Sequence, residues 1–235
     1  MIRRRAGPVV VAIVAALLAA CVPRPIAPAE VESGSPAGFP NAYYQRLRTE
    51  GKPVFRVDPA RSLVVLDVRR GGTFAQFGHD HVIASHSVSG NIAPEEGRAD
   101  LYVPLRELVV DEADLRAEAG LGPPLDASDV EGTRHNMLDK VLDAGRYPYV
   151  LISVGNVGAA DGPRQMPFSM TMHGTQRLVE ASAQVERTVE AISVSGTVAI
   201  DQSSFGITPL SLLGGAIAVQ DRVDIRFHIR AYATP

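Results

Sequence analysis

The stretch RVDIRFHIRAY, which runs from Arg222 to Tyr232 near the end of the chain, decides the fold class. Its odd-numbered positions are apolar, and its even-numbered positions are polar or amphipathic. Successive side chains of an extended strand point to opposite faces, so this alternation predicts a strand with one dry and one wet face. Such strands are typical of antiparallel sheets, in which one face covers the interior and the other meets water.

The same alternation recurs through much of the preceding chain. Apolar and polar residues alternate at 98–103, 165–173 and 192–200, and further strands are predicted at 62–68, 82–92, 149–157 and 177–185. Residues 173–176 (HGTQ) separate two of these runs at hairpin distance, with Gly174 for the turn. Eight or more strands in sequence order predict a mainly β protein built as a closed antiparallel barrel, because closure leaves no exposed sheet edges. A two-sheet sandwich is the alternative, since periodicity does not distinguish the two.

One segment, about 111–144, lacks the alternation and is rich in Asp, Glu, Ala and Leu. It predicts a helical excursion with a short helix near 111–119 and a longer one at 126–144. Asp126 or Ser128 can cap the longer helix, and Gly145 followed by Pro148 ends it. We expect this helix to plug or cover one end of the barrel.

The first 20 residues have the pattern of a signal peptide. Arg3, Arg4 and Arg5 precede an unbroken run of 12 apolar residues, Val9 to Ala20, which is shorter than the ~20 residues that span a bilayer. Small residues then lead directly to Cys21, the one cysteine of the sequence, in a pattern that resembles a bacterial lipobox. We therefore predict lipid attachment at Cys21. A plain signal segment with an incidental cysteine is the alternative.

A lipid on Cys21 predicts a membrane-anchored lipoprotein of the bacterial cell envelope that faces the periplasm. The residue after Cys21 is Val22 and not an aspartate. By resemblance to well-studied Gram-negative lipoproteins, this favours the outer membrane. Residues 21–53 contain six prolines and predict a tether, within which 41–48 is compatible with one or two helical turns. The folded domain is then predicted over 54–235.

Composition excludes one class of partner. The chain of 235 residues has a formal charge of −3 and a pI near 6.1, with 46% hydrophobic and 21% charged residues. A nucleic-acid-binding domain needs a clustered basic excess, so no nucleic-acid partner is predicted. The sequence does not decide between a monomer and a homodimer.

Three histidines are candidate metal ligands. His79 and His81 stand two apart, so on one strand they share a face, and His173 is the candidate third ligand. The alternative is a polar histidine cluster at the barrel rim, hydrogen-bonded to Asp80 and the backbone, because a metal site needs three or four converging ligands. No cofactor or catalytic residue is predicted, since the serines near these histidines lack a nucleophile-elbow pattern.

The sequence from about 55 to 233 resembles the YceI-like family of exported polyisoprenoid-binding proteins. The resemblance rests on the order and spacing of separate pieces: FRVD at 55–58 with Ser62, LDAGRYPYV at 142–150, MTMHGT at 170–175, and SSFGI at 203–207. It departs from the family pattern at Gln202, at Ser204 and in GHDHV at 78–82. The resemblance implies an extended lipocalin-type barrel that binds an apolar lipid without catalysis.

The dry faces of the strands would form either a solid core or a lumen. With no tryptophan and seven phenylalanines, few bulky rings are available to fill the interior, and flexible methionines suit an alkyl chain. We predict a lumen that holds a long apolar lipid such as a polyisoprenoid, with His79, His81 and His173 meeting the head group at one mouth. The lumen candidates are Phe168, Met170, Met172, Ile192, Val194, Phe205, Ile225, Phe227 and Ile229.

Overall fold

The computed structural model describes residues 34–157 and 160–234. Contacts divide the chain into two units, Met1–Glu30 and Val31–Pro235, and all described residues belong to the second. Its strands are β1 (Phe55–Val57), β2 (Leu63–Gly71), β3 (His81–Ser85), β4 (Ser89–Ala93), β5 (Arg98–Pro104), β6 (Val109–Val110), β7 (Tyr149–Gly155), β8 (Gly162–Met172), β9 (Thr175–Arg187), β10 (Ala191–Asp201), β11 (Ser211–Leu212) and β12 (Ile217–Ala233).

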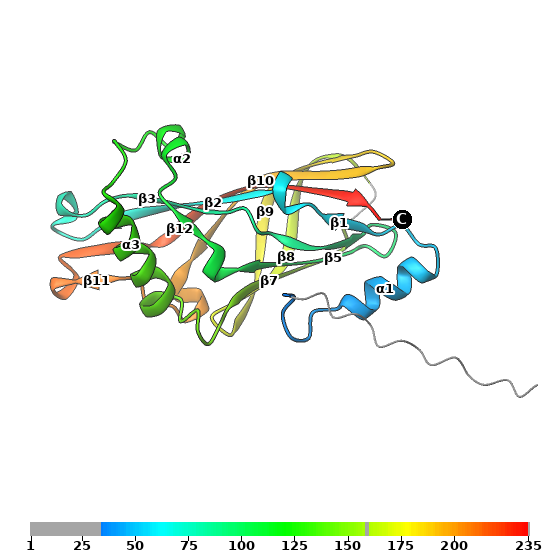
Figure 1. The fold of residues 1–235 in the computed structure, drawn as a ribbon, viewed down its shortest axis with the longest axis horizontal. Coiled ribbons are helices and arrows are strands. Elements are labelled where there is room, and N and C mark those ends of the chain that lie inside the picture. The colour runs from blue at the N-terminus through cyan, green and yellow to red at the C-terminus, as the bar shows by residue number, and fades with distance from the viewer. Residues whose placement is uncertain (1–33, 158–159, 235) are drawn as a thin grey trace, which may run out of the picture. The chain divides into compact units, whose positions relative to one another are not determined.

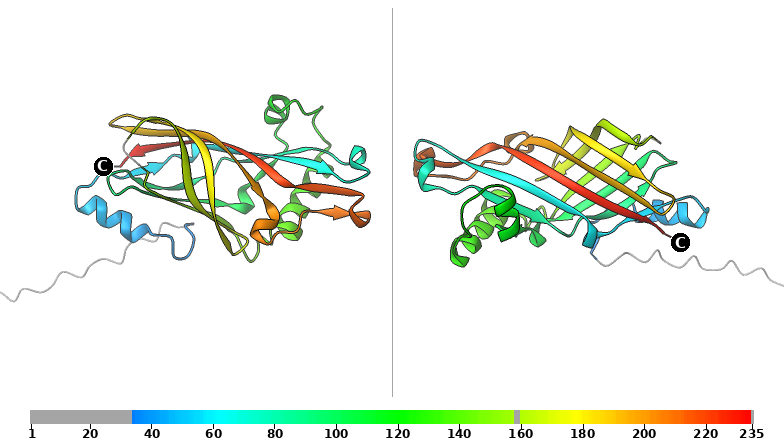
Figure 2. Two further views of the ribbon diagram at one scale, coloured as in Figure 1. Left: turned by 180° about the vertical axis from the view of Figure 1, so that it is seen from behind. Right: turned by 90° about the horizontal axis from the view of Figure 1, so that it is seen from above.

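Eight strands close into an antiparallel barrel (Figures 1 and 2). They pair in the order β1-β4-β5-β7-β8-β9-β10-β12, and β12 pairs with β1 to complete the ring. The 17-residue β12 is long enough to pair with β1 at 231–233 and with β2 along 218–228. The strands β2, β3 and β6 thus extend the barrel wall beyond β1, β4 and β5. The predicted closed barrel is confirmed, and the sandwich is not the architecture adopted.

The predicted strand at 82–92 is in fact two strands, β3 and β4. The first pairs with β2 and β6 in the extension, and the second pairs with β1 and β5 in the ring. Within β4, Gly90 has φ 150°, and a Cβ atom there would lie 2.2 Å from the carbonyl oxygen of Asp100. Only glycine allows the backbone of β4 to approach β5 so closely.

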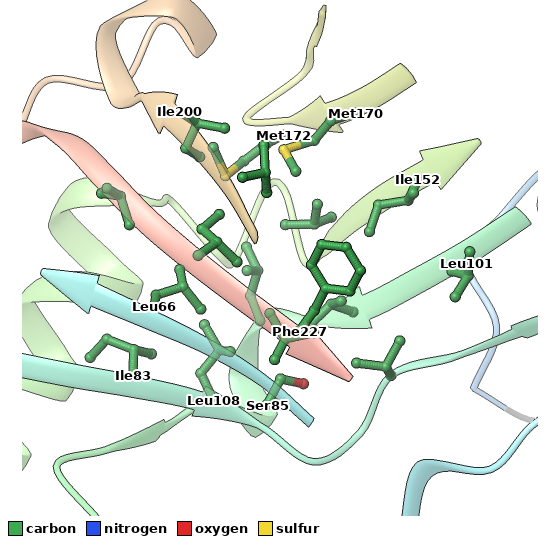
Figure 3. Close-up of a pocket in the computed structure, with 18 of the residues that line it drawn as sticks. Leu66, Ile83, Ser85, Leu101, Leu108, Ile152, Met170, Met172, Ile200 and Phe227 are labelled. Carbon is green, nitrogen blue, oxygen red and sulfur yellow. The ribbon is translucent and has the colours of Figure 1, made fainter. Parts of the chain in front are cut away.

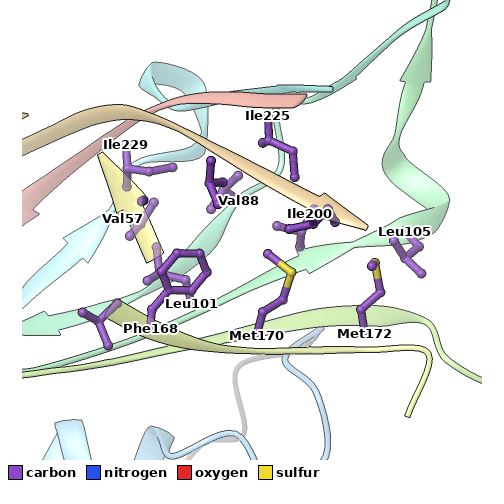
Figure 4. Packing of buried hydrophobic residues seen from close by; sticks show 14 of the residues in the cluster. Val57, Val88, Leu101, Leu105, Phe168, Met170, Met172, Ile200, Ile225 and Ile229 are labelled. Carbon is purple, nitrogen blue, oxygen red and sulfur yellow. The ribbon is translucent and has the colours of Figure 1, made fainter. Parts of the chain in front are cut away.

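The alternation of each strand directs its apolar face inward. Figure 4 shows Phe168, Met170 and Met172 of β8 on the opposite side of the interior from Ile225 and Ile229 of β12. The hairpin predicted between β8 and β9 is confirmed. Its two turn residues have positive φ values of 52° and 73°, as a two-residue turn that matches the twist of the strands requires.

The helical excursion is confirmed, with one difference in its second half. It contains α2 (Ala113–Glu118) and α3 (Ala127–His135), and α3 continues as the π-helix η4 (Asn136–Val141). Both α-helices lie at the end of the barrel opposite the C-terminus (Figures 1 and 2). The 3₁₀ helices are η1 (Pro59–Arg61), η2 (Ala75–Phe77), η3 (Leu105–Glu107), η5 (Gln202–Phe205) and η6 (Leu213–Gly215).

The predicted tether requires a correction over its second half. Residues Asn41–Thr49 form α1, which packs on the outside of the barrel near the C-terminus (Figure 1). Tyr44 and Leu47, three residues apart, are buried against Val54 and Ala93, because together they give the helix one apolar face. The helical turns expected at 41–48 are therefore present, and Pro40 and Pro53 flank the helix rather than interrupt it. The signal peptide, Cys21 and the first part of the tether lie outside the described residues.

The helices among the described residues do not reach the combination of length and apolarity that crossing a membrane requires.

Candidate functional site

The barrel contains an apolar cavity of about 310 Å³ (Figure 3). This volume lies at the lower end of the ~300–1,000 Å³ usual for small-molecule sites. All strands of the ring except β1 contribute to its wall, together with β2, β3, α3 and η4. Among the described residues, the polar members of this wall are His81, Ser85, Thr133, Asn136 and Gln202.

The cavity is elongated along the barrel. On β12 its wall runs from Val219 to Ile229, and on β10 from Ile192 to Ile200. At ~3.3 Å per residue, these segments measure roughly 33 Å and 26 Å along their strands. The apolar wall is therefore elongated along the barrel, a shape that suits a chain better than a compact molecule.

The structure brings together eight of the nine predicted lumen residues. Phe168, Met170, Met172, Ile192, Val194, Ile225, Phe227 and Ile229 all line the cavity. Figure 3 shows the ring of Phe227 pointing into it, with Met170 and Met172 on another part of the wall. Phe205 is the exception: it is buried in the core cluster but does not line the cavity. It lies on η5, beyond the last residue of β10, where the strand alternation no longer directs side chains inward.

The polar wall residues gather toward the end of the cavity that α3 covers. Thr133 and Asn136 belong to α3 and η4, and Met137, Val141 and Leu142 from the same segment add an apolar cover. This agrees with the expectation that the helix covers one end. At the other end of the barrel, where α1 and the C-terminus lie, the wall residues are apolar, among them Ala99, Val154 and Val157.

A buried polar trio, His81, Asp111 and Arg116, lies at the end of the cavity that α3 covers. His81 Nδ1 lies 2.6 Å from Asp111 Oδ2, and the Asp111 side chain has no exposed surface. Arg116 donates through a guanidinium nitrogen to Asp111 Oδ1 at 2.7 Å, and the Val82 backbone N–H donates to the same oxygen at 3.1 Å. Arg116 also donates to the carbonyl oxygen of Asp80 at 3.1 Å. The trio links β3 to the start of the helical excursion.

Asp111 is held ionised by its neighbours. Burial alone would raise the pKa of this carboxyl group, but the hydrogen bonds from His81, the Val82 N–H and Arg116 outweigh burial and lower the pKa below its ordinary value. The buried carboxylate is therefore balanced by the Arg116 guanidinium, as a buried charge requires.

The match to a known domain covers most of the chain. The YceI-like domain matches residues 55–231 of the sequence, which include every strand from β1 to β10 and most of β12. The chain belongs to the YceI-like family. A comparison with curated proteins finds no match.

Two solved structures share the YceI-like fold of this chain. A polyisoprenoid binding domain from Saccharophagus degradans, implicated in plant cell wall breakdown, has 13% sequence identity and a TM-score of 0.55, covering 77% of this chain and 98% of that chain. Burkholderia cenocepacia BcnA has 17% identity and a TM-score of 0.50, covering 74% of this chain and 98% of its own. At these identities the similarity establishes the fold alone.

The three histidines predicted as metal ligands of this YceI-like chain are not gathered into one site. His79 precedes β3 instead of lying on it, and the next residue, Asp80, accepts a hydrogen bond from the Arg70 backbone N–H at 2.8 Å. The rings of His79 and His81 are 6.4 Å apart and nearly perpendicular. His173 packs against the Tyr147 ring at 4.7 Å. Within 34–157 and 160–234, no three His, Cys, Asp or Glu side chains could hold a metal ion together.

Of the three histidines predicted to meet a head group, His81 alone among the described residues lines the cavity. Sequence reasoning missed both of its partners, Asp111 and Arg116. Asp111 is 30 residues away from His81, and the pairing of β3 with β6 brings the two together. One local signal was available: Asp111 directly follows the apolar pair Val109–Val110, where a carboxylate ends a short strand.

Proposed function

We propose that this YceI-like protein binds one long apolar lipid, such as a polyisoprenoid, in its barrel cavity, for carriage or sequestration and without catalysis. The observation that carries the proposal is the elongated apolar cavity, whose wall comes from nearly every strand of the barrel. The solved Saccharophagus degradans domain with the same fold, which is described as polyisoprenoid binding, supports the choice of ligand class.

The size of the cavity sets how much of the ligand is enclosed. A methylene group occupies about the volume of a water molecule, ~30 Å³, so 310 Å³ holds roughly ten such groups. Each buried CH₂ contributes about 0.8 kcal/mol, which gives roughly 8 kcal/mol before the entropic cost of association. Met166, Met170 and Met172 line the wall, and their flexible side chains accommodate chains of differing length and branching.

Absence of catalysis is part of the proposal. Ser85 is a hydroxyl on the cavity wall, and its Oγ accepts a hydrogen bond from the Ser87 N–H at 3.3 Å. Among the described residues, no histidine forms a hydrogen bond with Ser85, so the pairing that activates a serine nucleophile is missing there.

Exchange of one cavity residue tests the binding proposal. Met170→Glu places a carboxylate in the dry cavity, where its desolvation opposes lipid binding, and the protein should lose the lipid with which it co-purifies. Thr171→Glu is the matched control, because the adjacent residue of β8 points to the opposite face and does not line the cavity. Lipid is extracted and quantified only from variants whose far-UV circular dichroism equals that of wild type. A folded Met170→Glu protein that retains the same lipid in the same amount would contradict the proposal.

The proposal extends to the N-terminus, which lies outside the described residues. Cleavage before Cys21 and acylation of its thiol would anchor the lipid-binding domain to the envelope membrane, facing the periplasm. The support is the sequence pattern of Arg3 to Cys21. The intact mass of the membrane-extracted protein tests it. A mature form that begins at Met1, or an unmodified Cys21, rules the anchor out.

A further inference from the structure

The first inference concerns the polar end of the cavity and rests on the proposed function. The two ring nitrogens of His81 lie on opposite edges of the imidazole. Nδ1 faces the buried carboxylate of Asp111 at 2.6 Å, so Nε2 faces away from it. Nε2 has no hydrogen-bond partner among the described residues, and the His81 side chain forms part of the cavity wall.

The trio fixes which nitrogen of His81 carries the hydrogen. An ionised carboxylate can only accept hydrogen bonds, and Asp111 already accepts from Val82 N–H and Arg116. Nδ1 must therefore be the donor to Asp111. In the neutral imidazole, Nε2 then carries a lone pair and can only accept.

A second acceptor lies at the same level of the barrel. Across neighbouring strands, His81 pairs with Val68, Val68 pairs with Val223, and Val223 pairs with Ile200. Gln202 follows Ile200 by two residues and therefore lies near the level of His81. The Gln202 amide nitrogen donates to the carbonyl oxygen of Gln220 at 2.9 Å, which leaves the amide oxygen as an acceptor. Two acceptors in the polar part of an apolar wall favour a ligand that donates a hydrogen bond.

We propose that His81, oriented by Asp111 and Arg116, accepts a hydrogen bond from a hydroxyl group on the head of the lipid. The cavity then prefers lipid alcohols and phenols to ethers, esters or ketones with the same chain. The preference belongs to Nε2 of His81, and Asp111 acts as a positioning residue that sets the tautomer.

Matched ligands test this preference. Farnesol and farnesyl methyl ether share one chain and differ only in the hydroxyl hydrogen. We expect delipidated wild-type protein to bind farnesol about fivefold more tightly, the effect of one ordinary hydrogen bond. His81→Phe keeps a ring in the wall and should bind both ligands with equal affinity. His79→Phe, whose residue does not line the cavity, should keep the preference.

A spectroscopic measurement separates positioning from folding. The ¹⁵N chemical shifts of the His81 ring should report hydrogen on Nδ1 in the wild type and a change in Asp111→Asn, whose amide can donate to Nδ1. Equal binding of alcohol and ether by wild type, or a preserved preference in His81→Phe, would overturn the head-group inference alone. Failure to bind either ligand would instead contradict the proposed function.

The second inference comes from an exposed apolar tip beyond the same end of the cavity. The tip consists of Phe74 and Phe77, between β2 and β3, and Leu212 and Leu213, which precede β12. Phe77 is 71% and Leu213 78% exposed, and the other two are about half exposed. These four side chains are an unusual concentration of apolar surface for two short turns.

The two turns of the tip are built to stay together. The Phe74 N–H donates to the carbonyl oxygen of Ala216 at 2.7 Å. Gly72 has φ 87°, and a Cβ atom there would lie 2.5 Å from the carbonyl oxygens of Gly215 and Ala216. Glycine is therefore required where the turns meet. Leu210 and Val219, which flank the second turn and are joined by a hydrogen bond of 2.9 Å, line the cavity.

We infer that the tip docks on the surface of a lipid bilayer, where the cavity exchanges its ligand. Exposed aromatic and aliphatic side chains suit insertion at the boundary between head groups and acyl chains. Arg69 and Arg70, with side chains about 40% exposed, flank the tip on β2. With Asp80 between them they leave a net positive charge, which is attracted to anionic lipids.

Flotation with vesicles of phosphatidylethanolamine and phosphatidylglycerol in equal parts tests this inference. Non-acylated protein is used, so that the lipid proposed on Cys21 does not cause flotation by itself. We expect wild type to float with the vesicles and the Phe77→Ser/Leu213→Ser protein to lose at least three quarters of that binding. Leu178→Ser is the control, because Leu178 is equally exposed but lies on β9. Farnesol affinity should not change. Equal flotation of wild type and tip variant overturns the inference, as does wild-type self-association that the tip substitutions abolish, since the tip would then bind a second copy.

Discussion

At the scale of single residues, Asp111 is the most constrained group at the polar end of the cavity. Its carboxylate accepts hydrogen bonds from His81, Arg116 and the Val82 N–H, and these partners lower its pKa against the effect of burial. A carboxyl group with a lowered pKa in the folded state stabilises the fold above its unfolded pKa of ~3.9. That contribution is lost as the pH falls through the folded pKa.

Asp111→Asn should therefore change the acid dependence of stability. At pH 7 the variant should have a lower free energy of unfolding than wild type, because Arg116 keeps its buried charge without a carboxylate partner. As the pH falls below about 4, the wild type loses the contribution of Asp111 and the two curves should converge. Urea unfolding at pH 7, 5, 4 and 3 measures the difference. Curves that stay parallel down to pH 3 would show that Asp111 is not held ionised.

Phe227 is an aromatic side chain that narrows the cavity. Its ring points into the cavity, opposite Gly196 on β10. Phe227→Ala should enlarge the cavity and lower the free energy of unfolding of the lipid-free protein by about 3 kcal/mol, the lower end of the range for Phe→Ala in a core, because Phe227 is only partly buried. The ratio of its affinity for longer prenols to its affinity for farnesol should be higher than in wild type. Titration with a series of prenols checks this. An unchanged preference for chain length would mean that the bound lipid does not contact Phe227.

At the scale of elements, α1 joins the barrel through a polar contact that burial strengthens. Tyr44 is fully buried and donates to Asp100 Oδ2 at 2.7 Å, and Asp100 also accepts from Arg98 and Ser153. Burial raises the pKa of the Tyr44 hydroxyl, and the hydrogen bond to the Asp100 carboxylate raises it further. The contribution of this neutral hydroxyl to stability is present below ~pH 10 and is lost as the pH rises above that value.

Tyr44→Phe should separate this contact from the packing of the ring. We expect the variant to lose about 1.5–3 kcal/mol of unfolding free energy at pH 7, because a hydrogen bond to a buried charged group disappears. The difference from wild type should shrink above ~pH 10, where the unfolded tyrosine ionises. Chemical denaturation at pH 7, 9, 10.5 and 11.5 provides the comparison. A constant difference over this range would mean that the hydroxyl is not shielded in the folded protein.

The elements also show what sequence periodicity can and cannot predict. Alternation identified the barrel strands and eight cavity residues. This was possible because the side chains that face inward on a strand follow directly from the local alternation of apolar and polar residues. Alternation did not predict that 82–92 divides between the ring and its extension, since this depends on which partners β3 and β4 find. Helical turns were expected at 41–48, but their packing on the barrel was not, because the buried face of α1 consists of two residues, Tyr44 and Leu47. The link between His81 and Asp111 depends on tertiary pairing across 30 residues.

At the scale of the whole molecule, the cavity, its polar end and the apolar tip are arranged along one direction of the barrel. The apolar end lies toward α1, and the trio, α3 and the exposed tip lie at the other. An amphiphile held with its chain among the β12 and β10 side chains and its head near His81 satisfies both the dry wall and the free acceptors. The central claim is therefore that the barrel interior is a ligand site and not a solid core.

Native mass spectrometry of the wild-type protein extracted from its own host tests that claim most directly. We predict a main species heavier than the bare chain by the mass of one apolar lipid, which organic extraction releases and which Met170→Glu lacks. Wild-type protein that shows only the mass of the polypeptide with its covalent modifications, in every preparation from the host, would contradict the account and identify the barrel interior as core.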